Sequence, residues 1–197
     1  VDPDYFHPNG VEPDPFNIAF FGSMDWRPNQ DAVHYFYEEI WPLVKAAVPV
    51  ATFTIVGRKP PASILRLSES DGGIQVTGTV DDVRPYLWRA ALTVVPLRIG
   101  GGSRLKILES LSACKPVVAT GVAAEGLEGV NDWVTIEDRP SAFAERVVEL
   151  LGAGRRSPHD LADAREFVVT HYSWNAAAGL MDRAWSMPWF LNWDKRE

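Results

Sequence analysis

The chain alternates short, continuous apolar runs with segments of helical periodicity, and this alternation limits its fold more than any other feature. The apolar runs are apolar at every position rather than at every second one, which is typical of parallel strands buried on both faces. Strands are predicted at Asn17–Phe21, Ala51–Val56, Ile74–Thr77, Ala91–Val95, Pro116–Ala119 and Trp133–Ile136. The sequence therefore predicts an α/β fold: a doubly wound, Rossmann-like parallel sheet of about six strands, flanked by helices.

Helices are predicted between and after these strands. In Asn29–Val48, the residues Ala32, Phe36, Ile40 and Leu43 fall on one face, as in a helix packed on a sheet. The other predicted helices are a short one that runs from a capping Asp81 to Arg89, and then Ser103–Ala113, Ser141–Leu151, Pro158–Thr170 and Trp174–Trp185. Ligands of such sheets bind beyond the carboxyl ends of the strands. Functional residues are therefore expected in the loops after Phe21, Val56, Val95 and Ala119.

The predicted domain is flanked by two segments of different composition. Val1–Pro15 contains four prolines and four acidic residues, so residues 1–16 are predicted to be an interdomain linker, with a frayed terminus as the alternative. Residues 17–172 form the predicted domain. Residues 173–197 hold a last helix and an aromatic tail, which either packs on its own domain or covers a partner. The large side chains toward the end are Trp185, Pro188, Trp189, Phe190 and Trp193.

Charge and cysteine content argue against several functions. The formal net charge of −7 argues against a general nucleic-acid binder, which would be basic. A single cysteine, Cys114, excludes an internal disulfide framework and a multi-cysteine zinc site. The four histidines are dispersed and form no cluster that would indicate a metal site. No stretch approaches the roughly 20 apolar residues of a membrane span.

The most informative loop follows the fourth predicted strand and reads PLRIGGGSRLKILE from Pro96 to Glu109. Three glycines allow a ligand to approach the backbone closely, and Ser103 is expected to cap the next helix. The free amides of a helix N-terminus favour an anion, and three cationic side chains add positive charge. The glycines are Gly100, Gly101 and Gly102, and the cations are Arg98, Arg104 and Lys106. A solvated glycine-rich turn is the alternative interpretation.

The type of anion follows from what surrounds this loop. It lacks the G-x-x-x-x-G-K-[ST] pattern of a triphosphate loop, and no G-x-G-x-x-G follows the first strand. Glu109 shares a helix face with Ser103 and Lys106, and its carboxylate can accept two hydrogen bonds from a ribose diol. These features predict a nucleoside diphosphate or its sugar ester, whereas a surface pair of Glu109 with Lys106 remains open.

Several motifs in chain order resemble the C-terminal, donor-binding domain of retaining glycosyltransferases of family 4 (glycosyltransferase group 1). They are Phe21–Pro28, Val56–Gly57, Thr79–Leu87 (TVDDVRPYL), Gly101–Glu109 (GGSRLKILE) and Ser110–Ala119 (SLSACKPVVA). The resemblance covers Val1 to about Trp174 and implies one half of a GT-B architecture, in which two Rossmann-like domains face each other. It implies transfer of a hexosyl group from a nucleotide-diphosphate sugar to an acceptor with retention, as in polysaccharide biosynthesis. Such enzymes generally need no metal, so the resemblance implies neither a metal nor a cofactor.

The resemblance also assigns roles by position. It gives Glu109 the donor ribose, and base binding is expected at Gly57, Arg58 and Val80. Diphosphate and sugar binding is expected at Gly100, Gly101, Gly102, Ser103, Arg104, Lys106 and Arg27. Gly101 stands where family members have a sugar-binding glutamate, so backbone amides are expected to take over. Ser23 and Pro28 replace two basic residues, and Arg27, Arg104 and Lys106 are expected to restore their charge.

The catalytic residues and the acceptor pocket of the family belong to an N-terminal domain that is missing from this chain. The chain alone is therefore expected to bind nucleotide but to be inactive. A cytoplasmic protein is expected, with any peripheral contact with the inner membrane made through the absent domain. Two alternatives remain: a non-catalytic nucleotide-binding or regulatory module, and a sugar-nucleotide epimerase-like domain.

Overall fold

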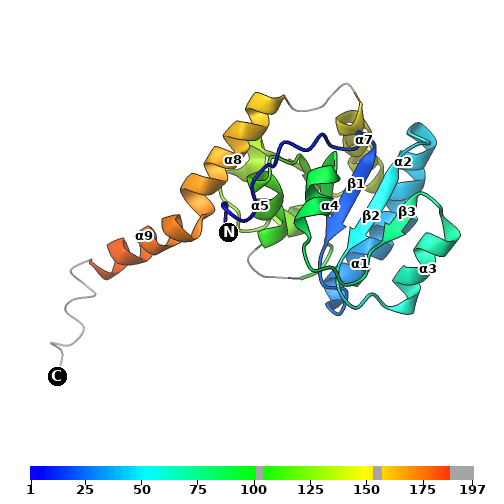
Figure 1. Cartoon of the computed structure of the whole chain (residues 1–197), viewed down its shortest axis with the longest axis horizontal. Coiled ribbons are helices and arrows are strands. Elements are labelled where there is room, and N and C mark those ends of the chain that lie inside the picture. Colours follow the sequence, from blue (N-terminus) through cyan, green and yellow to red (C-terminus); the bar gives the residue numbers. More distant parts are fainter. Residues whose placement is uncertain (101–103, 153–156, 187–197) are drawn as a thin grey trace.

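The computed structural model describes residues 1–100, 104–152 and 157–186. Within them, six parallel strands form one sheet in the order β3-β2-β1-β4-β5-β6 (Figure 1). The strands are β1 (Asn17–Phe21), β2 (Thr52–Val56), β3 (Ile74–Val76), β4 (Leu92–Val95), β5 (Val117–Ala119) and β6 (Val134–Ile136). The predicted doubly wound, Rossmann-like sheet is confirmed, because strand order reverses at the neighbours β1 and β4.

Helices cover both faces of the sheet. On one face α2 and the π-helical turn η1 pack against α7, and on the other α5 packs against α8 while α4 contacts β1. The elements are α1 (Arg27–Tyr35), η1 (Phe36–Ile40), α2 (Trp41–Ala47), α3 (Ala62–Ser70), α4 (Arg84–Arg89), α5 (Leu105–Ser112), α6 (Gly121–Ala124), the 3-10 turn η2 (Val130–Asp132), α7 (Pro140–Leu151), α8 (Pro158–Tyr172) and α9 (Trp174–Trp185).

The predicted helix over Asn29–Val48 exists but is not uniform, and Leu43, predicted on its packed face, is 45% exposed. It divides into α1, η1 and α2, with the π-helical turn directly before Trp41–Pro42. Proline has no N–H to continue the ladder and its ring crowds the preceding turn. A π-helical turn at this position accommodates it.

Two predicted helix starts were wrong. Helix α4 begins at Arg84 rather than beyond a capping Asp81, because Asp82 is the residue whose carboxylate accepts from the Arg84 amide, at 2.9 Å. Helix α5 begins at Leu105, and its N-cap is Arg104 rather than Ser103. Arg104 has φ of 55°, in the left-handed region, so the chain enters the helix one residue later than the pattern indicated.

The first sixteen residues contain no helix or strand, yet they pack on the body. Arg165 of α8 donates from its guanidinium to the carbonyl oxygens of Pro3 and Phe6, at 2.9 and 3.0 Å. The amino group of Val1 donates to Tyr172 O at 2.7 Å, and Trp174 N donates to Val1 O at 3.1 Å. Whether this segment links two domains remains a prediction.

Helix α9 extends away from the rest of the molecule (Figure 1). None of its residues is buried, and Trp174, Met181 and Trp185 expose 66%, 55% and 56% of their surface. The predictions for Pro188, Trp189, Phe190 and Trp193 lie outside the described residues. No helix in the described ranges is long and apolar enough to cross a membrane.

Candidate functional site

A cleft of about 460 Å³ opens at the carboxyl ends of β1 and β2 and beside the first turns of α5. It brings together five of the predicted residues: Gly57, Arg58, Val80, Lys106 and Glu109. The remaining lining residues are Phe6, Phe21, Gly22, Ser23, Val56, Thr79, Val83 and Leu105. This edge is where a doubly wound sheet binds its ligands.

The floor of the cleft is made by two glycines in contact. Gly22 N donates to Val56 O at 3.0 Å, and a Cβ on Gly57 would lie 1.8 Å from Gly22 O. Only glycine therefore fits at position 57. This close approach joins the loops after β1 and β2 into one surface.

Lys106 and Glu109 lie on α5, where burial changes the acidity of both. Desolvation lowers the pKa of the Lys106 ammonium and raises that of the Glu109 carboxyl, while the attraction between the two charges opposes both shifts. No salt bridge joins them, and both line the cleft, so the solvated surface pair is not what the structure forms. A cation and a carboxylate therefore face the cleft within one helical turn of each other.

The other predicted cations are engaged elsewhere. Arg98 donates to the carboxylate of Asp31 at 2.6 and 3.0 Å and lies over the Tyr35 ring, at 4.6 Å from its centroid. Arg98 lines none of the described cavities near Lys106, so the predicted pocket of three cations is wrong for this residue. Arg104 donates to the Glu125 carboxylate at 3.1 Å. Their partners are distant in sequence, and this explains why the local pattern did not show the pairing.

A smaller cavity of about 250 Å³ adjoins the cleft and shares Leu105 and Lys106 with it. Gly100 and Arg104, two further predicted residues, line this cavity together with Asn29. Arg27 is exposed at the start of α1 and lines neither of the two. Gly101, Gly102 and Ser103, predicted to contact diphosphate and sugar, lie outside the described residues.

The sequence interpretation missed two residues of the site. Phe6 belongs to the segment read as a linker, and nothing in its pattern indicated that it lines the cleft. Asn29 is almost completely buried, and a signal for it existed. It stands three residues before Ala32 and seven before Phe36, on the apolar face of the predicted helix, where a polar side chain is unexpected and indicates a specific role.

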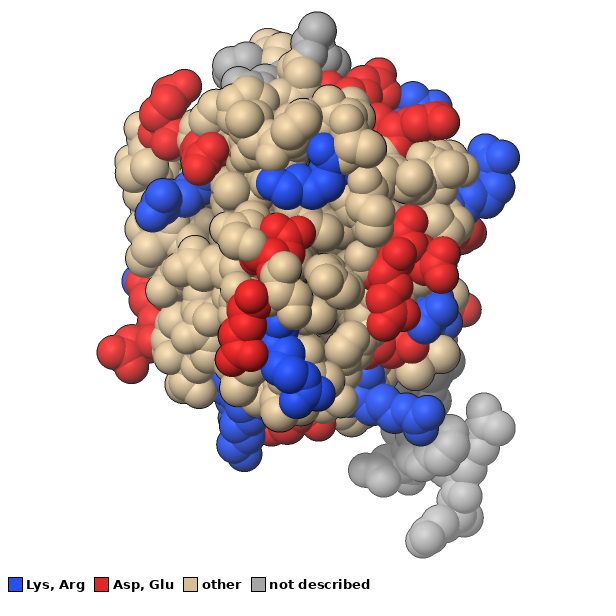
Figure 2. Space-filling model, turned by 90° about the vertical axis from the view of Figure 1, so that its right-hand side faces the viewer, with Lys and Arg blue, Asp and Glu red and all other residues tan. Residues whose placement is uncertain are grey.

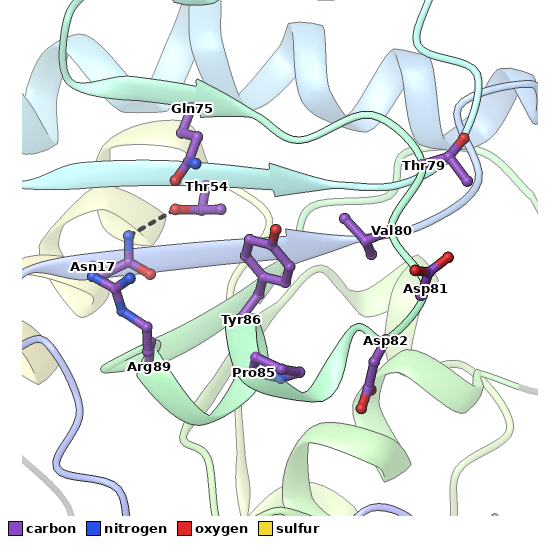
Figure 3. A pocket seen from close by; sticks show the side chains of 10 residues that line it. All are labelled: Asn17, Thr54, Gln75, Thr79, Val80, Asp81, Asp82, Pro85, Tyr86 and Arg89. Carbon is purple, nitrogen blue, oxygen red and sulfur yellow. Dashed lines mark hydrogen bonds between the residues drawn. The ribbon is translucent and has the colours of Figure 1, made fainter.

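A further cavity of about 620 Å³, larger than the cleft, lies along the face of the sheet (Figure 3). Asn17, Thr54 and Gln75 line it from β1, β2 and β3, and Tyr86 and Arg89 from α4. Asn17 Nδ2 donates to Thr54 Oγ1 at 2.8 Å, so the side chains of Asn17 and Thr54 already partner each other. Most of this groove runs along the strands rather than at their carboxyl ends, and the 460 Å³ cleft is therefore the better candidate site.

Charges on the surface are mixed near the β3 edge. Figure 2 shows the side of the molecule that lies at the right of Figure 1, and Lys and Arg are interspersed there with Asp and Glu. Among the residues that the structure describes, no three His, Cys, Asp or Glu side chains gather as a metal site would require.

Residues 15–153 match a family model described as Glycosyl transferases group 1. No curated protein has a sequence that matches the chain. Structures of similar fold have been solved, and those named here are at most 16% identical to this chain, so they show the fold alone.

Three of these structures illustrate the range. A point mutant of TarM of S. aureus, solved with fondaparinux, α-GlcNAc-glycerol and UDP, gives a TM-score of 0.73 at 16% identity over 92% of this chain and 37% of TarM. The C-terminal domain of LpcC, a glycosyl transferase group 1 family protein from Francisella tularensis, gives a TM-score of 0.69 at 16% identity. That match covers 88% of this chain and 99% of the LpcC domain. HepE of Anabaena, solved with UDP, gives a TM-score of 0.68 at 13% identity over 95% of this chain and 56% of HepE. The chain thus spans about a third of TarM and about half of HepE.

Proposed function

The chain belongs to the glycosyl transferases group 1 family, and we propose that it is the donor-binding half of a retaining, family 4 hexosyltransferase. In this proposal it binds a nucleotide-diphosphate sugar. The N-terminal half of the same enzyme supplies the acceptor pocket and the catalytic residues, with residues 1–16 as linker and residues 173–197 as crossover helix and tail. The 197-residue chain alone then binds nucleotide without transferring sugar.

The observation that carries the proposal is the placement of Lys106 and Glu109 in one cleft at the carboxyl ends of the strands. A diphosphate is matched by an ammonium, and a ribose diol is matched by a carboxylate that can accept two hydrogen bonds. The bases of nucleotides differ in their polar edges, and Gly57, Arg58 and Val80 line the side of the cleft formed by the loops after β2 and β3. UDP is the first nucleotide to test, since TarM and HepE were solved with it.

The proposed chemistry is the departure of the nucleoside diphosphate from the anomeric carbon of the sugar. Negative charge grows on the leaving phosphate as this bond breaks, and a fixed cation stabilises the charge where it develops. Lys106 lies in a partly desolvated position, where such an interaction is stronger than in water. We assign it the diphosphate, with the backbone amides of residues 101–103 as further proposed donors.

Calorimetry with UDP, GDP, ADP and TDP tests the proposal on the 197-residue chain. We expect one of them to bind, Lys106→Ala and Glu109→Gln to weaken that binding about tenfold or more, and Glu69→Gln on the remote, exposed end of α3 to leave it unchanged. If none of the four binds at millimolar concentration, the donor-domain proposal fails. Binding without any transfer by the full-length protein would instead favour the non-catalytic module.

A further inference from the structure

Asn29 presents a buried hydrogen-bond acceptor without a donor. Its side chain is 3% exposed, and Nδ2 donates to Ser23 O at 2.7 Å. That bond fixes the orientation of the amide, because the NH₂ group must face the Ser23 carbonyl. Within residues 1–100, 104–152 and 157–186, no donor reaches Asn29 Oδ1. A buried polar atom without a partner is uncommon in folded proteins and calls for an explanation.

Lys106 supplies the complementary group. Its ammonium forms no hydrogen bond and no ion pair with the described residues, although burial already lowers its pKa. A methyl group on Gly22 would lie 2.7 Å from Asn29 Nδ2 and 2.9 Å from Lys106 Cε, so both side chains flank the same glycine. Both also line the 250 Å³ cavity that adjoins the cleft. An acceptor without a donor therefore lies beside a donor without an acceptor.

We propose that Asn29 is a positioning residue for Lys106, whose ammonium donates to Asn29 Oδ1 and presents its remaining N–H groups to the donor diphosphate. Asn29 and Lys106 line the same cavity and flank the same glycine, which is the geometry that the pairing requires. Its functional meaning rests on the proposed donor-binding role of the cleft. Asn29 itself does not touch the substrate in this proposal.

An amide suits this task better than a carboxylate. It holds the ammonium without neutralising it, so the full positive charge remains available to the anion. The other charged groups at the cleft and the adjoining cavity are Glu109 on α5, Arg58 after β2 and Arg104, which is paired with Glu125. Glu109 is the one that acts on the Lys106 charge, and Asn29 adds a neutral contact from α1.

The first test needs no nucleotide. The pKa of Lys106 is followed by NMR of ε-¹³C-lysine in the 197-residue chain and is assigned with Lys106→Arg. Asn29→Leu is expected to lower this pKa by about one unit, since the charged form loses its acceptor, and Asn29→Asp is expected to raise it. The control is Asn131→Leu, an exposed asparagine that precedes β6 at the opposite edge of the sheet, and it should leave the pKa unchanged. If Asn29→Leu fails to fold, the Lys106 pKa in Asn29→Asp is the deciding measurement: an upward shift supports the pairing, and no shift overturns it.

The second test is a double-mutant cycle on UDP affinity. Asn29→Leu is expected to weaken binding about tenfold in the wild-type background and less than about twofold in Lys106→Ala, because its effect passes through the lysine. The inference is overturned if the Lys106 pKa responds to neither Asn29 variant. It is also overturned if the losses of UDP affinity caused by Asn29→Leu and Lys106→Ala multiply in the double variant. If the pKa responds but no nucleoside diphosphate binds, the pairing stands and the proposed function fails.

Discussion

The contact between Gly57 and Gly22 has a direct consequence for single substitutions. A Cβ at position 57 would lie 1.8 Å from a backbone oxygen, and neither loop can yield without moving the end of a strand. We expect Gly57→Ala to lower the free energy of unfolding by at least about 3 kcal/mol, at the upper end of overpacking effects. Gly72→Ala is the matched control: its added methyl meets nothing within 4 Å, and its effect should stay within about 1 kcal/mol. Urea unfolding measures both, and equal effects would contradict the contact.

Lys115 makes the stability of the protein depend on pH. Its ammonium is buried and donates to Trp88 O at 2.6 Å, and desolvation lowers its pKa from the ordinary value of 10.5 to about 8. Between pH 8 and 10.5 the unfolded chain holds a proton that the native protein has released, so the free energy of unfolding rises with pH in this window. Two and a half pKa units correspond to at most about 3 kcal/mol.

The check is urea unfolding of the wild type and Lys115→Met across pH 7–11. We expect the difference between their free energies of unfolding to shift in favour of the wild type between pH 8 and 10.5 and to stay flat below pH 8. Other titrating groups are common to both proteins and cancel. A difference that is flat across the whole range would show that the native Lys115 titrates normally.

At the scale of elements, α9 exposes a large apolar surface, and none of its residues is buried. Met181 and Trp185 lie one turn apart, and more than half of each is exposed. We expect Met181→Gln combined with Trp185→Gln to change the free energy of unfolding by less than about 0.5 kcal/mol, as surface substitutions do. The same change should reduce self-association, measured by sedimentation at high concentration, because apolar patches of this kind promote contact. A large loss of stability would mean that the helix packs on the body in solution.

The elements differ in how well local sequence determined them. All six strands were predicted within one residue at each end. In a chain that alternates apolar runs with helical segments, a short run that is apolar at every position is typical of a parallel strand buried on both faces. Helix α3 was not predicted: it follows Pro60–Pro61 and buries only Ile64 and Leu67, too few for a periodic signal. The short α6 and η2 were not predicted either.

The site was predictable to the extent that it follows from topology. Lys106 and Glu109 share a helix, and that helix follows a strand, so their meeting with Gly57 and Arg58 at one edge follows from the parallel sheet. The engagement of Arg98 by Asp31 joins positions 67 residues apart, and no local pattern records it. Asn29 was missed although it is a polar residue on an apolar face, and its proximity to Lys106 became visible only in the folded chain.

At the scale of the whole molecule, the cleft unites both halves of the sheet. Gly57 and Arg58 follow β2, whereas Lys106 and Glu109 follow β4, so a ligand bound between them stabilises both halves at once. At a concentration of 100 times its Kd, UDP should raise the free energy of unfolding by about 2.7 kcal/mol. Urea unfolding with and without UDP measures this gain. Glu109→Gln should gain less at the same concentration, and equal gains would remove Glu109 from the site.

The hydrogen bonds that join Val1 to Tyr172 and Trp174 have a mechanical consequence. Val1 and the residues that lead into α9 therefore lie at a single location, although 171 residues separate Val1 from Tyr172. In the proposed two-domain enzyme, a second domain connected through both segments would therefore pivot about one point instead of being held at two separated points. Such a connection would leave tilt and twist of the second domain nearly free while it fixed the distance, so contacting surfaces, or a ligand bound between the two halves, would have to set their orientation.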